Sequence, residues 1–181
     1  MDGTLTVPVH DFDAIRIDLG LPPGRPILET LASMPTAQAA PLHRRLQEIE
    51  RELAERGQAG PGVCDVLHEL KSRGSVMAIL TRNSGELAHI TLQAAGLADF
   101  FEPELVLGRE DAEPKPSPQG IQRILSSWSA EAEGTTMVGD YLFDLQAGRS
   151  AGCRTVLLDP GGHGRWREWA DEVVCDLGAL L

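Results

Sequence analysis

The chain has 181 residues, of which 42% are hydrophobic and 24% are charged, and its formal net charge is −11. This length can bury one sizeable core with a modest insertion, and the composition is that of a folded domain, which argues against a disordered chain. The net negative charge argues against nucleic acid or an anionic membrane surface as the main partner, because both reward clustered Lys and Arg.

The cysteines and the apolar runs bear on the cellular compartment. Cys64, Cys153 and Cys175 are isolated and show no metal-ligand spacing. We expect Cys153 and Cys175 to be buried, inert thiols, because both lie in or beside apolar runs. No stretch approaches the ~20 apolar residues of a membrane span, and the first residues lack the basic region of a signal peptide. The sequence therefore predicts a cytoplasmic protein.

Residues 1–9 predict a turn followed by an outgoing extended segment. Asp2-Gly3 followed by Thr4 is turn chemistry, and Val7-Pro8-Val9 continues as the extended segment. At the other end of the insertion, the glycine-rich stretch 57–62 predicts a return hinge. Two such connections would let the inserted segment tilt over a site and exclude water. An ordinary loop with helix-stopping glycines is the alternative.

Residues 10–56 predict an insertion of about three helices. Residues 11–19 and 26–33 are short helical candidates, separated by the Gly-Leu-Pro-Pro-Gly breaker at 20–24. A longer helix follows, because Leu42, Leu46, Ile49 and Leu53 recur at spacings of 4, 3 and 4. Such an apolar stripe indicates packing rather than a partner site.

From residue 63 onward, helical and strand patterns alternate. Helices are expected at 63–73, 86–95, 118–128 and 143–151, and strands at 76–80, 104–107, 135–139, 154–158 and near 173–175. This alternation predicts an α/β fold with a mainly parallel sheet and right-handed crossovers. We therefore expect a core domain of residues 1–9 and 57–181 and a helical cap of residues 10–56.

Polar side chains follow three of the expected strands. The strand before Gly139 hands over to Asp140, and Asp144 falls in the first turn of the next helix. Thr81 follows the strand at 76–80, and Lys115 lies between two prolines in the loop after the strand at 104–107. Open α/β folds bind ligands at the carboxyl ends of their strands. An acid, a hydroxyl and an ammonium at this edge suit a metal-bound phosphate.

The same residues carry a resemblance to a known family. Asp2-Gly3-Thr4-Leu5, Thr81, Lys115, Gly139-Asp140 and Asp144 occur in the order of the motifs of the haloacid dehalogenase (HAD) superfamily. The chain resembles a phosphatase of this superfamily with a small helical cap inserted after the first motif, similar to the phosphoglycolate phosphatase and β-phosphoglucomutase branch. The resemblance spans nearly the whole chain and implies a Rossmann-like core that uses Mg²⁺.

The resemblance implies roles for three carboxylates. Asp2 corresponds to the general acid/base, and its backbone carbonyl is expected to ligate Mg²⁺. Asp140 is the best metal ligand, an oxygen donor of the type that Mg²⁺ prefers. Asp144 is expected to act in support, through water or by holding Lys115, and helix capping is its alternative role. The implied metal site is thus Asp2, Asp140 and Asp144.

The remaining motif residues are expected to bind the phosphate. The Thr81 hydroxyl would bond a phosphate oxygen, and the backbone N–H groups of Arg82 and Asn83 would add donors at the start of the next helix. Lys115 would reach the phosphate as a point charge, unless it is a solvated surface lysine. The expected phosphate-binding residues are Gly3, Thr4, Thr81, Arg82, Asn83 and Lys115. His10 and Arg16 lie where a cap could touch the substrate.

One departure from the family pattern concerns the first motif. The family reads Asp-x-Asp-Gly-Thr after an apolar strand, and its first Asp is the nucleophile, whereas here Met1 stands at the x position. We expect that Met1 is an internal Met and that the nucleophile and its strand lie upstream. A chain without the nucleophile is the alternative. In the family this strand is central in the sheet, so another segment or a second chain would otherwise have to fill its place.

The leading hypothesis is a Mg²⁺-dependent phosphatase that hydrolyses a small phosphorylated metabolite through an aspartyl-phosphate. Asp2 favours phosphoryl transfer over dehalogenation, because dehalogenases need no proton donor to the leaving group. The alternatives are a catalytically impaired metal- and phosphate-binding protein, or a phosphomutase with the same core residues. We expect no nucleic-acid or membrane partner and a monomer or homodimer.

Overall fold

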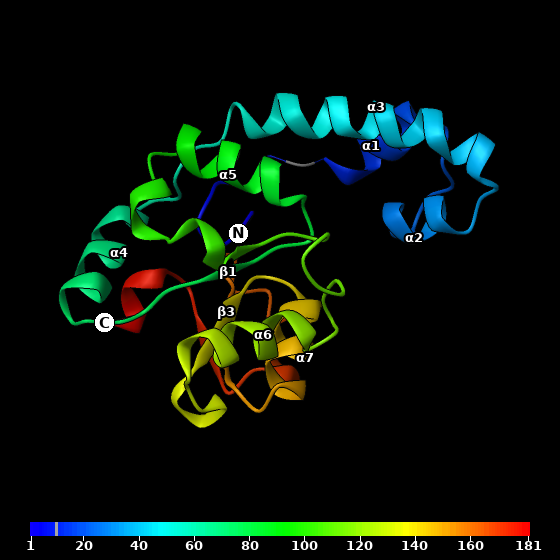
Figure 1. Ribbon diagram of the computed structural model, residues 1–181. Coiled ribbons are helices and arrows are strands. Elements are labelled where there is room, and N and C mark those ends of the chain that lie inside the picture. The colour runs from blue at the N-terminus through cyan, green and yellow to red at the C-terminus, as the bar shows by residue number, and fades with distance from the viewer. Residues whose placement is uncertain (10) are drawn as a thin grey trace.

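The structure is a computed structural model that describes residues 1–9 and 11–181 (Figure 1). Its core combines parallel strands with helices, so the α/β prediction is confirmed. One sheet pairs β1 (Ile79–Leu80) with β2 (Val106–Leu107). The other sheet has the order β3-β4-β5, with β3 (Thr136–Gly139), β4 (Arg154–Leu158) and β5 (Glu172–Val174). Every pairing between these strands is parallel, although they form two sheets rather than one.

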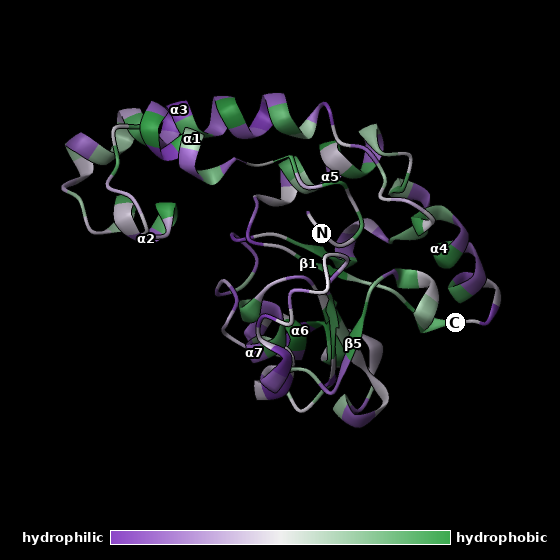
Figure 2. Cartoon of the chain, turned by 180° about the vertical axis from the view of Figure 1, so that it is seen from behind, coloured by the Kyte–Doolittle hydropathy of each residue, from purple (hydrophilic) through white to green (hydrophobic). Residues whose placement is uncertain are grey.

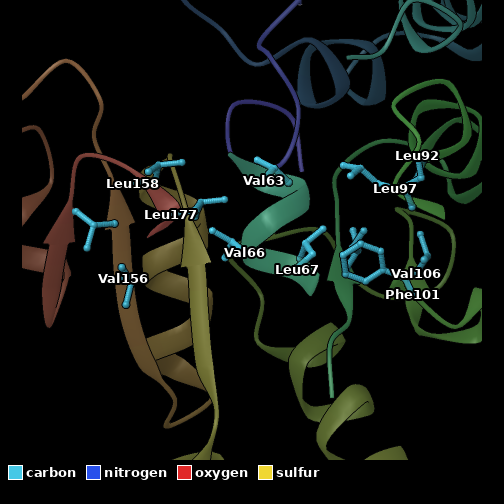
Figure 3. Packing of buried hydrophobic residues seen from close by; sticks show 13 residues of the cluster. Val63, Val66, Leu67, Leu92, Leu97, Phe101, Val106, Val156, Leu158 and Leu177 are labelled. Carbon is cyan, nitrogen blue, oxygen red and sulfur yellow. The ribbon is translucent and has the colours of Figure 1, made fainter. Parts of the chain in front are cut away.

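The helix α4 (Val63–Ser72) packs between the two sheets. Its buried side chains Val63, Val66 and Leu67 belong to one hydrophobic cluster with residues of both sheets. Figure 3 shows the strands of the larger sheet on one side of α4 and β1 on the other. In this cluster Val156 comes from β4 and Val106 from β2. The shared cluster thus holds the two sheets in one core.

The other helices of the core lie close to their predicted positions. They are α5 (Gly85–Ala94), α6 (Gln119–Trp128) and α7 (Leu142–Ser150). Short 3₁₀ turns cover Ala98–Phe100, Pro103–Leu105, Ala132–Gly134, Arg167–Trp169 and Leu177–Leu180. In the part of the chain that the structure describes, no helix is both long and apolar enough to cross a membrane.

Two predicted strands are shorter in the structure. The pattern at 76–80 predicts five strand residues, but β1 contains only Ile79 and Leu80, and Val76 is 62% exposed. The segment 104–107 begins in a 3₁₀ turn at Pro103, and β2 starts only at Val106. Proline fits the first turn of a helix because its φ is fixed and it has no N–H to donate. Both strands are therefore shorter than their apolar sequence patterns predict.

The inserted helices form an arm beside the core. They are α1 (Phe12–Asp18), α2 (Ile27–Ala32) and α3 (Thr36–Ala54), and they project from the core in Figure 1. Their buried side chains, Ile15, Leu31 and Leu46 among them, form a cluster of their own. Apolar and polar segments alternate along α3 in Figure 2, as expected for an amphipathic helix.

The two connections to this arm run side by side. The Val7 backbone N–H donates to the Gln58 carbonyl, and the Gly60 N–H donates to the Leu5 carbonyl, both at 2.9 Å. Thr6 and Ala59 also form an isolated antiparallel bridge. The residues that leave the core and those that return to it thus form one short two-stranded connection.

The cysteine predictions are half right. Cys64, Cys153 and Cys175 are free thiols, and Cys153 is buried as expected. Cys175 is exposed, so the prediction of a buried thiol is wrong there. Val174, the last residue of β5, is buried. Because successive side chains of an extended segment point to opposite sides, the residue after Val174 turns outward.

Candidate active site

A cavity of about 360 Å³ lies between the inserted helices and the residues that follow β1 and β3. It brings together polar residues from the chain start, from the loops after β1 and β2 and from the turn into α7. These residues are Asp2, Thr81, Arg82, Asn83, Lys115, Asp140 and Asp144. Its other wall comes from α1, α2 and α3. The cavity therefore collects seven of the predicted site residues.

Asp140 meets the first residues of the chain. The Thr4 hydroxyl donates a hydrogen bond to Asp140 Oδ1 at 2.9 Å across 136 positions of sequence. Gly3 has a φ of +72°, and a Cβ added there would lie 2.3 Å from Asp140 Oδ2. Glycine is therefore required at position 3, both for its backbone conformation and for this close approach. Burial raises the pKa of the Asp140 carboxyl above its ordinary value.

Asp144 combines the two roles that the sequence left open. Its Oδ1 accepts a hydrogen bond from Lys115 Nζ at 2.5 Å, and both side chains are buried. Its Oδ2 accepts from the backbone N–H of Tyr141 at 3.1 Å, which caps the start of α7. A Cβ added at Gly139 would lie 2.4 Å from Asp144 Cγ, so this glycine leaves room for the carboxylate.

Lys115 is a buried residue and not a solvated surface lysine. Its side chain is 7% exposed, and Nζ also donates to the Leu80 carbonyl at 2.7 Å. The ammonium has three donors, so these two bonds leave a third for an anion in the cavity. Because Leu80 ends β1, the bond fixes the ammonium beside Thr81.

Thr81, Asn83 and Asp2 form a second hydrogen-bonded group. The Asn83 side-chain amide donates to Asp2 Oδ2 at 2.8 Å, and the Asn83 backbone N–H donates to Thr81 Oγ1 at 3.1 Å. Thr81 is buried, and its backbone N–H donates to the Leu107 carbonyl of β2. Since its hydroxyl oxygen accepts from Asn83, the hydroxyl proton can be donated to an oxygen in the cavity.

The Arg82 side chain connects the core to the inserted helices. Its guanidinium pairs with Glu29 of α2 and lies 5.0 Å from the ring centroid of Phe143. The sequence predicted only a backbone role for Arg82 and missed this contact, because no local pattern pairs residues 53 positions apart. Arg16 of α1 also lines the cavity. His10, named with Arg16 as a residue that could touch substrate, lies outside the described residues.

A second ion pair between core and cap was also missed. Arg109, in the loop after β2, donates from both terminal nitrogens to the two carboxylate oxygens of Glu50 on α3, at 3.2 and 3.1 Å. The side chains are only 16% and 11% exposed. Glu50 lines the cavity, so this pair holds α3 against its edge.

The three carboxylates of the predicted metal site all line this cavity, and they differ in the contacts that their oxygens already make. Within residues 1–9 and 11–181, no three His, Cys, Asp or Glu side chains are grouped so that they could hold a metal ion. Both carboxylate oxygens of Asp144 accept hydrogen bonds, one from Lys115 and one from the Tyr141 N–H. In Asp140, the hydrogen bond from Thr4 goes to Oδ1 and does not involve Oδ2. Mg²⁺ sites often use one or two carboxylates plus substrate phosphate and water, so Asp140 with Asp2 fits such a site.

Comparisons with known proteins identify the family of this site. The model of the family described as haloacid dehalogenase-like hydrolase matches residues 19–158. An uncharacterized hydrolase of Saccharomyces cerevisiae is 30% identical over 188 residues, covering 100% of this chain and 86% of that protein. The probable phosphatase IndB of Dickeya dadantii is 34% identical, covering 88% of this chain and 70% of that protein.

A phosphoglycolate phosphatase and a solved structure agree with this match. The phosphoglycolate phosphatase of Caulobacter vibrioides is 28% identical, covering 97% of this chain and 73% of that protein. The structure of a haloacid dehalogenase-like family hydrolase from Streptococcus pneumoniae superimposes with a TM-score of 0.79 at 19% identity. It covers 99% of this chain and 93% of that chain, so the two share the fold.

Proposed function

The chain belongs to the haloacid dehalogenase-like hydrolases, and from this membership and the cavity we propose that it is a Mg²⁺-dependent phosphatase acting on a small phosphorylated metabolite. One observation carries the proposal: the buried Lys115 ammonium is held beside Thr81 by Leu80 and Asp144. A fixed cation next to a hydroxyl donor suits the equatorial oxygens of a phosphoryl group in transfer.

In this proposal, different residues of the cavity bind the phosphate and protonate the leaving group. Lys115 and the Thr81 hydroxyl hold the phosphate, with backbone N–H groups of Arg82 and Asn83 as further donors. Asp2 protonates the leaving oxygen, and Asn83 and Thr6 orient its carboxylate. The nucleophile is an aspartate two positions before Asp2, which follows from the likeness of Asp2-Gly3-Thr4 to the family's first motif. Its attack on phosphorus forms an aspartyl-phosphate that water then hydrolyses.

The proposed metal site uses Asp140 and Asp2. The Asp140 carboxylate and the Asp2 backbone carbonyl would hold Mg²⁺, which supplies positive charge between the anionic phosphate and the carboxylates. The Thr4 hydroxyl fixes the Asp140 carboxylate, and Gly3 keeps the approach to it open. We further propose that the protein is cytoplasmic and that it acts as a monomer or homodimer. Its substrate would be a free metabolite.

The test is Mg²⁺-dependent hydrolysis of p-nitrophenyl phosphate by two chains. One is residues 1–181, and the other carries in addition the residues that its gene encodes upstream. We expect Mg²⁺-dependent activity in the extended chain, and we expect Asp140→Asn to abolish it or to raise the Mg²⁺ concentration that it requires. Glu133→Gln changes an exposed carboxylate outside the cavity and serves as the matched control.

Two other results would count against this proposal. If neither chain releases phosphate from a panel of phosphomonoesters at any Mg²⁺ concentration, the phosphatase proposal is wrong. Retained binding of inorganic phosphate in such inactive chains would instead support the metal- and phosphate-binding alternative. Formation of a phosphorylated isomer from a sugar phosphate would support the phosphomutase.

A further inference from the structure

Aromatic and apolar side chains line the cavity beside its proposed phosphate end, which is formed by Asp2, Thr81, Lys115 and Asp140. Tyr141 and Phe143 reach the cavity from the turn into α7, and Phe12 reaches it from α1. Tyr141 is 49% exposed and Phe12 is 56% exposed. The inserted helices add Ile15, Ile27, Leu28 and Leu46 to the lining. The space that would receive the organic part of a phosphate ester is therefore bounded by rings and aliphatic side chains.

The Tyr141 ring is held in place by its neighbours. It makes edge-to-face contacts with Phe143, at 5.2 Å between centroids, and with Trp166, at 4.7 Å. The Arg82 guanidinium lies 5.0 Å from the centroid of Phe143. Tyr141 also follows Asp140 directly, and its backbone N–H donates to Asp144. A half-exposed ring is thus fixed one residue away from the phosphate end.

The charges around this wall are already paired. Among the described residues that line the cavity, Arg82 pairs with Glu29, Lys115 with Asp144 and Arg16 with Asp13. Glu50 pairs with Arg109. A second anionic group on a substrate would therefore have to compete with an existing carboxylate. An uncharged group would leave these pairs intact.

The size of the cavity also fits a ring. Its volume of about 360 Å³ lies within the range of roughly 300–1,000 Å³ that is typical of pockets for drug-sized ligands. Aromatic rings gain energy from stacked or edge-to-face contacts beyond the area that they bury. A flat ring next to Tyr141 would gain these contacts, whereas a short alkyl group would not.

We propose that the substrate is a phosphomonoester whose organic part carries an uncharged, planar aryl or heteroaryl ring close to the ester oxygen, and that Tyr141 selects for this ring. This inference rests on the proposed function, because it names the substrate class of the same cavity. Tyr141 is a specificity-determining residue, and it takes no part in the transfer of the phosphoryl group.

The first test measures binding without turnover. Phenylphosphonate and methylphosphonate are titrated by calorimetry, with Mg²⁺ present, into the chain and into its Tyr141→Leu and Tyr141→Phe variants. We expect phenylphosphonate to bind about three- to tenfold more tightly than methylphosphonate. Tyr141→Leu should abolish this difference, and Tyr141→Phe, which keeps the ring, should retain it. Circular dichroism establishes that each variant is folded.

The second test measures turnover, which separates this inference from the proposed function. We expect Tyr141→Leu to lower kcat/KM for phenyl phosphate by about three- to tenfold, with little change for ethyl phosphate. Each ester is compared between the wild type and the variant in the extended chain, so that the difference in leaving groups cancels. If the extended chain hydrolyses neither ester but still prefers phenylphosphonate, the phosphatase proposal is wrong and the ring-binding wall is still supported.

Two results would overturn the inference. One is equal affinity for the two phosphonates, or a preference that survives in Tyr141→Leu. The other is tighter binding of phosphonoacetate than of phenylphosphonate, with the gain lost in Arg16→Gln. That second result would mean that Arg16 selects a carboxylate on the substrate and that Tyr141 does not select a ring.

Discussion

The two ends of the cavity are built in different ways. At the proposed phosphate end, side chains from the loops and turns that follow the strands bond to backbone groups, as Lys115 does to the Leu80 carbonyl and Asp144 to the Tyr141 N–H. At the cap end, long side chains meet across an interface, as Arg82 does with Glu29 and Arg109 with Glu50. The first end is fixed by the core itself, whereas the second depends on where the cap lies.

This difference suggests a division of labour. Groups that stabilise a transition state must be held before the substrate arrives, and backbone bonds to a packed core achieve this. Groups that recognise the organic part can sit on an element that moves, and ion pairs across the interface can set its closed position. Substitutions at the phosphate end should therefore affect catalysis and folding together, and those at the cap end should mainly affect substrate affinity.

The largest effect is expected from Lys115→Met. It removes the cation from the phosphate end and leaves the buried Asp144 carboxylate without its partner. Breaking a buried pair by removal of one member costs about 3–5 kcal/mol. We expect kcat/KM to fall by about 10²-fold or more and the midpoint of urea unfolding to fall with it. Lys71→Met, at an exposed lysine, is the control. An unchanged kcat in a folded Lys115→Met protein would contradict the role of this ammonium.

Gly3→Ala should have the next largest effect. The new Cβ would lie 2.3 Å from Asp140 Oδ2, on a backbone with a φ of +72°. The left-handed conformation alone costs about 1–2 kcal/mol in a residue with a side chain. Gly74→Ala is the matched control, because its φ is +79° and nothing lies within 4 Å of the added Cβ. We expect both variants to lose stability, measured by thermal unfolding. Only Gly3→Ala should raise the Mg²⁺ concentration that gives half-maximal hydrolysis.

The cap end is tested by a double-mutant cycle on Glu50→Gln and Arg109→Gln. Because both side chains are mostly buried, we expect a coupling energy of about 1–3 kcal/mol in urea unfolding. The exposed pair Arg51 and Glu86 also joins α3 to the core, and its coupling should be at most about 1 kcal/mol. In hydrolysis, Glu50→Gln should raise KM more than it lowers kcat. If Glu50→Gln lowers kcat and leaves KM unchanged, the cap end acts on catalysis, and the proposed separation between the two ends of the cavity is wrong.

The phosphate end was predictable from the sequence, because each of its residues follows an apolar strand or sits in a short local motif. Thr81 and Asp140 come directly after such strands, and Lys115 lies between prolines. The cap end was not predictable in this way. Glu50 and Arg109 are 59 positions apart, and only the packing of α3 against the core brings them together.

The fold shows the same contrast. Helices were placed within a few residues because their apolar periodicity and their glycine stops are local signals. The lengths of β1 and β2 depend on which strands lie beside them, which no local pattern specifies. The exposure of Cys175 depends on where β5 ends, so an apolar neighbourhood in sequence gave the wrong answer there.

The smallest effect is expected from Asp171→Asn, which changes a carboxylate that is bonded to the backbone outside the cavity. Asp171 accepts hydrogen bonds from the backbone N–H and the hydroxyl of Thr155, and these bonds lower the pKa of its carboxyl. A lowered pKa adds stability above the pKa of the unfolded chain, and this stability is lost as the pH falls through the folded pKa. Asp171→Asn should therefore lower Tm at pH 7, and the difference should shrink in acid, since the wild-type carboxyl is then protonated too. Asp65→Asn, at an exposed helix residue, is the control. A Tm difference that stays constant down to acid pH would mean that the Asp171 charge contributes nothing, and that backbone bonds position this carboxylate without stabilising its ionised form.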